Sequence, residues 1–387
     1  MNILFLLKSL GVGGVEIVTA TLANKFVEEG HHICIYAFEK RSGMLIDYLH
    51  QDVEAYVAGK YQTSKKNVAL LREIIKLHNI QVVINQWGLP LVPVKTVCLA
   101  SKGINIKLIT VYHSDPLKNG RIQNVESVIR NTKNNLMKNV FRIKKVIYRC
   151  ITGYAMRYNY SKSDCYLVLS PSFISHFKQF IWVRSVPKLK VQANPLTIDS
   201  DSFMYQQDYK QNEIIYVGRI DNKVKRVDRV IEVWSHLEKL FPNWQLTIIG
   251  EGDDLINIKR MVRDLKLEHI SLEGSQNPKP YYERASLLLL TSEFEGFGLV
   301  LTECMSFGVV PVVYGSYSAV YDIVEDGKNG IIVPQKPSGF NVALMAEKIQ
   351  ELMTDKTRLN EMAISAIEKS KHYSLDIIYQ EWMKVIQ

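Results

Sequence analysis

Residues 287–303, LLLLTSEFEGFGLVLTE, hold the pattern from which the rest of the chain can be interpreted. The apolar run Leu287–Thr291 has the length of a buried strand, and a glycine-rich turn separates it from a helical pattern that begins near Gly298. The first N–H groups of such a helix have no intrahelical partners and lie at the positive end of the helix dipole, which favours an anion. Glycines at 296 and 298 let a ligand approach the backbone closely. The stretch therefore predicts a strand–turn–helix unit with an anionic ligand at its turn.

Two carboxylates of this stretch, Glu295 and Glu303, lie eight positions apart. On a helix that spacing corresponds to at most about 12 Å, which is comparable to the span from ribose to hexose in a nucleotide sugar. Each ionised carboxylate accepts two hydroxyl hydrogen bonds, which suits a vicinal diol. The alternative is a surface glutamate beside a capping turn. The complete string, rather than any single residue in it, favours a sugar-nucleotide site.

Alternating strand and helix patterns extend in both directions from this stretch. In the first half the expected strands are Ile3–Leu7, His32–Phe38, Val82–Asn85, Lys107–Tyr112 and Tyr166–Leu169, and the expected helices are Val15–Glu29 and Asn67–His78. In the second half the expected strands are Glu213–Val217, Trp244–Ile249, Ile270–Glu273, Leu287–Thr291 and Val309–Val313, and the expected helices are Val227–Leu240, Asp254–Leu265, Pro280–Ala285 and Leu299–Phe307. The polar segment Asn194–Asn212 predicts a linker between the two series. The alternation predicts two parallel sheets with helices on both faces, whose ligands bind outside the carboxyl ends of the strands.

A second motif, Tyr216-Val217-Gly218-Arg219, stands at the end of an expected strand, and Lys225 follows shortly before the next helix. Arg219 and Lys225 are expected to converge there and to offset the charge of a departing diphosphate. The alternative is a pair of ordinary surface cations, since 48 of the 387 residues are Lys or Arg.

Two features of the first half lie just after expected strands. The loop Gly11-Val12-Gly13-Gly14 suits a phosphate or a sugar, but Glu16 occupies the third glycine position of the dinucleotide fingerprint, which disfavours an NAD-dependent oxidoreductase. His113 follows Tyr112 and offers an imidazole for a sugar hydroxyl. A structural histidine is the alternative.

Composition excludes several protein classes. The chain of 387 residues is 47% hydrophobic and 22% charged, as expected for two ordinary globular domains. No run approaches the roughly 18 apolar residues of a membrane-spanning helix, and residues 1–7 predict a buried strand rather than a signal segment. The five cysteines are scattered without paired spacing, which predicts reduced cytosolic thiols and no metal site. Asp199-Ser200-Asp201 lacks a preceding apolar strand and is interpreted as a solvated turn.

Positive charge is concentrated in residues 118–162. This segment holds eleven Lys or Arg residues against one acid, Glu126, whereas the whole chain carries +9. Within it, Asn135–Thr152 predicts an amphipathic helix with Lys138, Arg142, Lys145 and Arg149 on a separate face from its apolar residues. Such a helix would bind an anionic membrane surface, or its apolar side would pack on its own domain. Nucleic acid is not an expected partner, because no aromatic stacking platform accompanies the charge.

Together, these motifs resemble the retaining glycosyltransferases of family 4, also described as glycosyl transferases group 1. The residues that carry the resemblance are Glu295-x7-Glu303, Gly218-Arg219 with Lys225, and Ile249-Gly250-Glu251-Gly252. The loop with Gly13 and Gly14, His113 and Asn194-Pro195 also fit. The resemblance implies an α/β protein of GT-B fold, with two Rossmann-like domains facing a cleft. Residues 1–193 would bind the acceptor, residues 194–371 the nucleotide sugar, and a C-terminal helix in residues 372–387, around Trp382, would pack back on the N-terminal domain.

The resemblance also implies a role for each motif residue. Arg219 and Lys225 would bind the donor diphosphate, Glu295 the donor hexose and Glu303 the ribose, while His113 would reach the transferred sugar. Further donor-site residues would be Gly13, Gly14, Gly218, Ser275, Gln276, Gly296, Phe297, Gly298 and Leu299. No metal or other cofactor is expected. One departure stands out, because Arg226 follows Lys225 where the family often has glycine or a small residue, and Arg226 could then take the role of Lys225.

The implied activity is transfer, with retention, of a hexose or N-acetylhexosamine from a nucleoside diphosphate sugar. UDP is the expected nucleotide, and the acceptor would be a lipid-linked saccharide in cell-surface polysaccharide biosynthesis, such as lipopolysaccharide or capsule. The enzyme would be cytoplasmic and peripheral on the inner face of the membrane. Two alternatives share the fold: a non-catalytic nucleotide-sugar-binding protein and a nucleotide-sugar epimerase.

Overall fold

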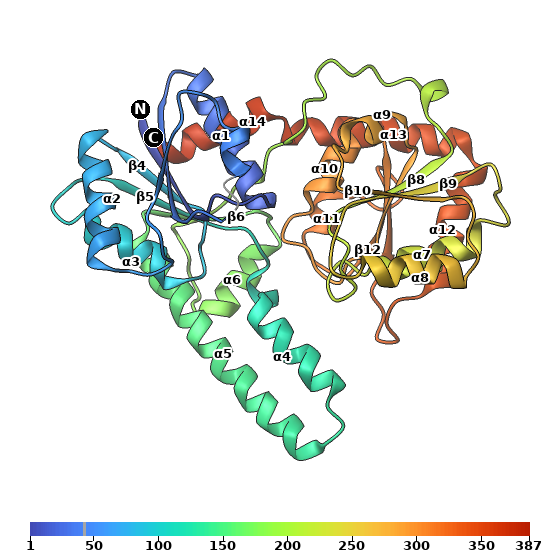
Figure 1. The fold of residues 1–387 in the computed structure, drawn as a ribbon, viewed down its shortest axis with the longest axis horizontal. Helices are drawn as coiled ribbons and strands as arrows, with labels where there is room; N and C mark the ends of the chain where they lie inside the picture. Colours follow the sequence, from blue (N-terminus) through green and yellow to red (C-terminus); the bar gives the residue numbers. More distant parts are fainter. Residues whose placement is uncertain (42–43) are drawn as a thin grey trace. The chain divides into compact units, whose positions relative to one another are not determined.

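The computed structural model describes residues 1–41 and 44–387, and the chain divides into two units (Figure 1). Unit 1 comprises Met1–Thr197 and Leu375–Gln387, and unit 2 comprises Ile198–Ser374. Each unit is built on one sheet whose neighbouring strands all pair in parallel, with helices on both faces. The predicted α/β class with two Rossmann-like domains is therefore confirmed.

Unit 1 contains a seven-stranded sheet in the order β3-β2-β1-β4-β5-β6-β7. Its strands are β1 (Asn2–Ser9), β2 (His32–Glu39), β3 (Glu54–Val57), β4 (Val82–Asn85), β5 (Lys107–Tyr112), β6 (Cys165–Val168) and β7 (Leu189–Val191). Its helices are α1 (Gly14–Glu28), α2 (Lys65–Leu77), α3 (Leu91–Ala100), α4 (Gly120–Asn131), α5 (Asn135–Lys162) and α6 (Phe173–Ile181), with the short helices η1 (Met44–Tyr48) and η2 (Pro116–Lys118). The edge strands β3 and β7 are additions to the predicted set, because their short sequences carry little apolar alternation and only pairing makes them strands.

The C-terminal helix α14 (Leu375–Ile386) belongs to unit 1 and packs on α1. Asp376 pairs with Lys25 at 2.6 Å, and the Tyr379 ring meets the Phe26 ring edge-on with centroids 5.2 Å apart. Trp382 is only 2% exposed. Burial of these aromatic side chains holds the last residues of the chain to its first domain.

Helices α4 and α5 form a hairpin that projects from the sheet of unit 1 (Figure 1). The predicted amphipathic helix begins at Asn135 as expected but continues to Lys162 rather than ending at Thr152. Its apolar residues Leu136, Val140, Ile143 and Ile147 are exposed. These four residues therefore do not pack on the rest of their domain, whereas Phe141 of the same helix is partly buried.

Among residues 1–41 and 44–387, no helix combines the length and the apolar character that crossing a membrane requires.

Unit 2 contains a six-stranded sheet in the order β10-β9-β8-β11-β12-β13. Its strands are β8 (Glu213–Val217), β9 (Gln245–Ile249), β10 (Ile270–Gly274), β11 (Leu287–Leu290), β12 (Val310–Gly315) and β13 (Ile331–Pro334). Its helices are α7 (Val227–Leu237), α8 (Leu255–Asp264), α9 (Lys279–Arg284), α10 (Leu299–Ser306), α11 (Val320–Ile323), α12 (Val342–Thr354) and α13 (Lys356–Ser370), with η3 (Gln207–Tyr209) and η4 (Lys371–Tyr373). Every strand expected in this half is present with its bounds shifted by at most two residues.

The strand order fixes where each sheet can bind a ligand. In unit 2 the chain runs from β8 outward in one direction to β10 and then returns to β11 on the other side of β8. The loops that follow β8 and β11 therefore diverge and leave a crevice at the carboxyl edge. In unit 1 the same reversal lies between β1 and β4.

Candidate functional site

The loops that follow β8 and β11 are joined to each other by hydrogen bonds. The Thr291 hydroxyl donates to the backbone oxygen of Arg226 at 2.8 Å, and the Glu293 N–H donates to the backbone oxygen of Val224 at 2.8 Å. These bonds place the two strongest sequence motifs, which are about 70 residues apart in the chain, at the same crevice. Their proximity is a property of the sheet topology.

Lys225 and Glu295 form the central ion pair of this site. The Lys225 ammonium lies 2.6 Å from Oε1 and 2.7 Å from Oε2 of Glu295, and the Ser292 hydroxyl donates to Oε1 at 2.7 Å. Both charged side chains are largely buried. The carboxylate is therefore held in one orientation with a cation beside it, at the edge where a ligand would bind.

Arg226, which could have taken the role of Lys225, points elsewhere. Its Nε donates to Asp228 Oδ1 at 2.9 Å, and its Nη1 lies 3.5 Å from Glu293 Oε1. The backbone of Arg226 has φ of +54°, the left-handed conformation that glycine adopts without steric cost. The glycine common in the family thus suits the backbone at this position, and the cation beside Glu295 is Lys225.

Arg219 is the more exposed of the two expected phosphate ligands. Its Nη2 pairs with Asp221 Oδ2 at 2.9 Å, and its side chain is 63% exposed. Arg219 and Lys225 thus pair with different carboxylates in the structure. Arg219 lies on the loop that follows Gly218 and has room to turn toward a ligand.

The glycines after β8 and β9 are required by close contact between two loops. A Cβ on Gly250 would lie 1.9 Å from the backbone oxygen of Gly218, and a Cβ on Gly252 would lie 2.1 Å from that of Ile220. The Gly250 N–H donates to the Gly274 oxygen at 2.7 Å, which brings in the loop after β10. Ser275 and Gln276, the residues expected near the base, are on this third loop and are exposed.

Glu303 is buried on α10, where the Tyr282 hydroxyl donates to its Oε2 at 3.2 Å. Gly298 precedes this helix with φ of +92°, and no side chain among the described residues caps it. The Leu301 N–H donates to the Gly298 oxygen at 2.8 Å, so the N–H groups of Leu299 and Val300 are the ones available to an anion. Phe297 packs edge-on against Tyr373, while Gly296 is partly exposed.

The loop after β12 belongs to this site, although the sequence patterns did not single it out. The Tyr317 hydroxyl is buried without a hydrogen-bond partner among the described residues, and it lies 3.1 Å from where a Cβ on Gly298 would be. Burial, and then the Glu295 charge, raise the pKa of Tyr317. Ser316 donates to the Ser292 oxygen at 2.5 Å. In the sequence, this loop could have been identified by the polar residues Ser316, Tyr317 and Ser318, which directly follow the buried strand β12.

A second cluster of polar side chains lies at the carboxyl edge of the unit 1 sheet. His113 Nε2 is 2.7 Å from Gln86 Oε1, and burial lowers the pKa of His113 to about 4, so the imidazole is neutral near pH 7. Several buried polar atoms here have no hydrogen-bond partner among the described residues: His113 Nδ1, Gln86 Nε2, Trp87 Nε1 and Asp115 Oδ2. Buried polar groups are normally paired, so this group is suited to a hydroxyl-rich ligand.

Gly13 and Gly14 also lie at this edge of unit 1, at the start of α1. A Cβ on Gly13 would lie 2.8 Å from Glu16 Oε2, the end of a flexible side chain. The expected site residues therefore fall into two sets. Gly13, Gly14 and His113 belong to unit 1, and all the others belong to unit 2.

Comparison with known proteins covers nearly the whole chain. A family model described as "Glycosyltransferase Family 4" matches residues 12–190, and one described as "Glycosyl transferases group 1" matches residues 198–370. Among curated proteins, the chain is 25% identical over 396 aligned positions to a Campylobacter jejuni protein, covering 100% of this chain and 98% of that one. Its name is "GalNAc-alpha-(1->4)-GalNAc-alpha-(1->3)-diNAcBac-PP-undecaprenol alpha-1,4-N-acetyl-D-galactosaminyltransferase".

Two further similarities agree with this result. A lipopolysaccharide 1,6-galactosyltransferase of Salmonella typhimurium is 30% identical over 176 residues, which is 43% of this chain and 47% of that one. The solved structure of Anabaena HepE in complex with UDP superposes with a TM-score of 0.74 at 16% identity, covering 100% of this chain and 99% of that one. The structural likeness supports the fold.

The low pKa of His113 has a measurable effect on stability. Between pH 4 and 6.5 the unfolded chain binds a proton at this residue that the folded chain does not, so the free energy of unfolding falls as the pH falls through this range. We expect His113→Gln to reduce the slope of unfolding free energy against pH by up to about 1.4 kcal/mol per pH unit. Urea unfolding from pH 4 to 7 measures it, with the exposed His236→Gln as control. An unchanged slope would mean that His113 titrates normally.

Proposed function

This chain is a glycosyltransferase of family 4 with the GT-B fold, and we propose that it transfers a hexose or N-acetylhexosamine from a UDP-sugar to a lipid-linked saccharide, with retention of configuration. The observation that carries the proposal is the Lys225–Glu295 pair, fixed at the crevice between β8 and β11 beside an uncapped helix N-terminus. One cation, one carboxylate and free N–H groups match a diphosphate linked to a sugar.

The donor lies along the carboxyl edge of unit 2 in this proposal. The diphosphate binds the N–H groups at the start of α10 together with Lys225 and Arg219. Glu295 accepts hydrogen bonds from hydroxyls of the sugar, and Glu303 accepts those of the ribose. Ser275 and Gln276, which are exposed, contact the base in this proposal. The HepE structure that superposes on this chain is a complex with UDP, which supports a uridine nucleotide.

Sugar transfer breaks the bond between the anomeric carbon and the β-phosphate oxygen. The acceptor hydroxyl oxygen forms the new bond on the same face, its proton passes to the departing phosphate oxygen, and UDP is released. Positive charge from Lys225 and Arg219 stabilises the negative charge that develops on this oxygen. The donor site therefore needs no bound metal. His113, neutral at pH 7, acts as a hydrogen-bonding group rather than as a proton donor.

The acceptor is assigned to a lipid-linked saccharide because of the α4–α5 hairpin. Leu136 is 73% exposed and Ile143 is 62% exposed, and with Val140 and Ile147 they form one apolar stripe on α5. Basic residues flank this stripe, as in helices that lie on anionic membrane surfaces. The name of the C. jejuni relative gives an undecaprenol-linked saccharide, which has the same chemistry. The enzyme then works at the cytoplasmic face of the membrane in cell-surface polysaccharide synthesis.

Not all four basic residues of the expected helix face are equally available to a membrane. Lys145 pairs with Glu126 at 2.6 Å, and Arg149 donates to the Phe180 oxygen with its guanidinium stacked on the Phe180 ring. Arg142 is exposed and contacts only Asn139 of its own helix among the described hydrogen bonds, and Lys138 is partly exposed. Lys138 and Arg142 are therefore the residues to test.

Donor binding is tested by thermal unfolding with UDP, GDP and ADP. A nucleotide at about 100 times its Kd stabilises the folded protein by about 2.7 kcal/mol, which raises Tm. We expect UDP to give this shift and Glu303→Ala to lose it, because the ribose loses its carboxylate. Glu347→Ala, an exposed glutamate on α12, is the matched control and keeps the shift. A shift with GDP alone would contradict the assignment of UDP.

Catalysis is tested by release of UDP from a UDP-sugar with and without a lipid-linked acceptor. We expect Lys225→Ala to lower kcat by about 10²–10³, the usual effect of removing one group that stabilises transition-state charge. Lys223→Ala changes an exposed lysine of the same loop and should retain wild-type turnover. An equal fall in kcat in both variants would show that catalysis depends on the total positive charge of the loop rather than on the ion pair between Lys225 and Glu295. Conversion of the donor without acceptor would instead indicate an epimerase.

Membrane attachment is tested by sedimentation with vesicles of phosphatidylglycerol and phosphatidylcholine. Each basic residue near an anionic surface contributes about 1 kcal/mol, so Lys138→Gln with Arg142→Gln should weaken binding by about 2 kcal/mol, or about 30-fold. The matched control replaces the exposed Lys259 and Arg260 of α8 by glutamine. Equal binding to vesicles of phosphatidylcholine alone would reject an electrostatic attachment.

A further inference from the structure

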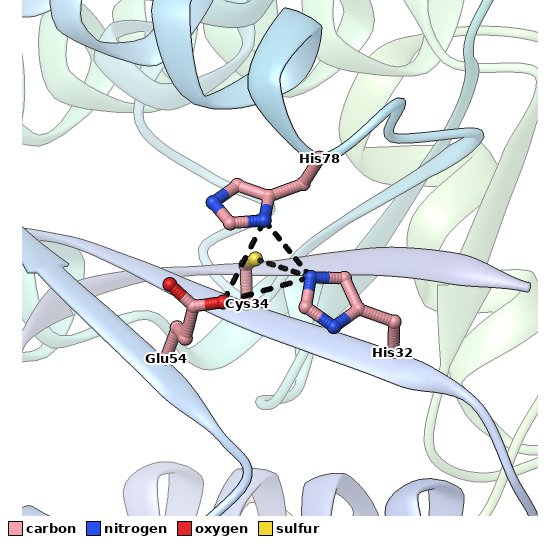
Figure 2. Close-up of side chains that lie close together, drawn as sticks. All are labelled: His32, Cys34, Glu54 and His78. Atoms are coloured by element: carbon pink, nitrogen blue, oxygen red, sulfur yellow. Dashed lines mark hydrogen bonds and ion pairs between the residues drawn. The ribbon is translucent and has the colours of Figure 1, made fainter.

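Four side chains of the kinds that bind transition metals meet in unit 1, at the opposite end of the strands from the site described above. They are His32, Cys34, Glu54 and His78, and their ligand atoms all lie within 4.8 Å of one another. His32 and Glu54 are the first residues of β2 and β3, and His78 directly follows α2. Figure 2 shows the four side chains pointing toward a common centre. The proposed binding sites for the sugar donor and the saccharide acceptor lie at the carboxyl edges of the two sheets. This cluster lies at the amino edge of the unit 1 sheet and is separate from both.

Strand register explains how residues so far apart in the sequence come together. Side chains two positions apart on a strand share a face, so His32 and Cys34 point the same way. Cys34 is paired in register with Glu54 on the parallel neighbour β3, which puts Glu54 on that face too. Helix α2 packs on this face through Leu71 and Ile74, so its end delivers His78 to the same place. The ligand set comes from three rigid elements rather than from a loop.

Four of the six distances between ligand atoms lie within about 0.5 Å of those in a tetrahedral zinc site. Zinc bonds of about 2.3 Å to sulfur and about 2.0–2.1 Å to nitrogen or oxygen put sulfur and nitrogen about 3.6 Å apart, and nitrogen and oxygen about 3.3 Å apart. In the structure, Cys34 Sγ lies 3.6 Å from His32 Nε2, and Glu54 Oε1 lies 3.8 Å and 3.6 Å from the ligand nitrogens of His32 and His78. His32 Nε2 and His78 Nδ1 are 2.9 Å apart, so these two nitrogens would move slightly apart to bind one metal ion.

Tyr56 supplies the outer hydrogen bond that metal-binding histidines usually make. Its oxygen lies 2.8 Å from His78 Nε2, and its hydroxyl donates to Glu54 Oε2 at 2.7 Å. The Nε2–H of His78 can therefore donate to Tyr56, which leaves Nδ1 unprotonated and directed at the cluster. The same hydroxyl restrains Glu54, so one residue orients two ligands.

The geometry points to a structural zinc site formed by His32 Nε2, Cys34 Sγ, Glu54 Oε1 and His78 Nδ1. Binding of Zn²⁺ displaces the Cys34 thiol proton to solvent, and the resulting thiolate and the Glu54 carboxylate balance the two positive charges of the ion. Four protein ligands complete a tetrahedral shell, so the metal is structural rather than catalytic. Cys34 is buried, whereas His32 and Glu54 are partly exposed, which gives the ion a path in from solvent.

A cluster held together only by hydrogen bonds and ion pairs is the competing explanation. It accounts for the His32–His78, Tyr56–Glu54 and Cys34–His32 contacts one by one. A metal site accounts in addition for the convergence of a thiol, two imidazoles and a carboxylate on one centre. Scattered cysteines without paired spacing predicted no metal site from the sequence. In this cluster only one cysteine is needed, because strand register supplies the other ligands.

The test uses the full-length protein, reduced and stripped of metal by dialysis against a chelator. Titration with Co²⁺ should give one equivalent of tetrahedral cobalt with a thiolate-to-cobalt charge-transfer band, and one equivalent of Zn²⁺ should abolish that band. Cys34→Ser should remove the band and His78→Gln should remove stoichiometric binding. Tyr56→Phe should keep the band but weaken metal affinity by about 10–100-fold, as expected for an outer-shell partner.

Matched controls separate this site from nonspecific binding. His50 lies 3.6 Å from Asp52, the same distance as His78 from Glu54. Among residues 1–41 and 44–387 it belongs to no cluster with a cysteine or a second histidine, so His50→Gln should leave the titration unchanged. Cys98→Ser, at a partly buried cysteine elsewhere in unit 1, should also leave it unchanged. Tyr56→Phe keeps all four ligands, so it remains informative if a ligand variant fails to fold. Wild-type protein without the charge-transfer band, or an undiminished band in Cys34→Ser, would overturn the proposal.

Discussion

Parallel pairing of every strand is the constraint on which both units depend. Because all strands of a sheet run the same way, every carboxyl end reaches one edge and every amino end the other. Loops carrying chemistry therefore collect at one edge without any direct attraction between them. In unit 2 this brings Lys225 and Glu295 into one ion pair across 70 residues of sequence, and reversal of strand order at β8 opens the crevice where they meet.

Close contact between loops then gives the proposed donor site its shape. The backbones after β8 and β9 approach so closely at Gly218 and Gly250 that a single Cβ would fall inside the van der Waals contact. Residues on these loops cannot be displaced independently. The loop after β8, which carries Lys225, is also hydrogen-bonded to the loop after β11, which carries Glu295. A cation and a carboxylate held in place before a ligand arrives reduce the reorganisation needed in the transition state. The hairpin of α4 and α5 differs, because its apolar stripe is exposed and available to a partner.

Parallel pairing also collects residues at the amino edge of the unit 1 sheet. Amino ends of β2 and β3 and the end of α2 meet there, and they bring two histidines, a cysteine and a glutamate together. One edge of a parallel sheet can thus serve the reaction while the other stabilises the domain. A metal at His78 would link α2 to β2 and β3, of which β3 is a short and mostly exposed edge strand.

Much of this protein was determined by the sequence itself. Apolar runs identified five of the six described strands of unit 2 and the α/β class, because burial on two faces imposes such runs. Amphipathic periodicity identified the basic helix from Asn135. The spacing of Glu295 and Glu303 and the glycine motifs indicated the family. Only the tertiary structure decided that Lys225 rather than Arg226 pairs with Glu295, that Tyr317 lines the site, and that His32, Cys34, Glu54 and His78 meet. Those outcomes depend on side-chain direction and strand register, which local sequence does not encode.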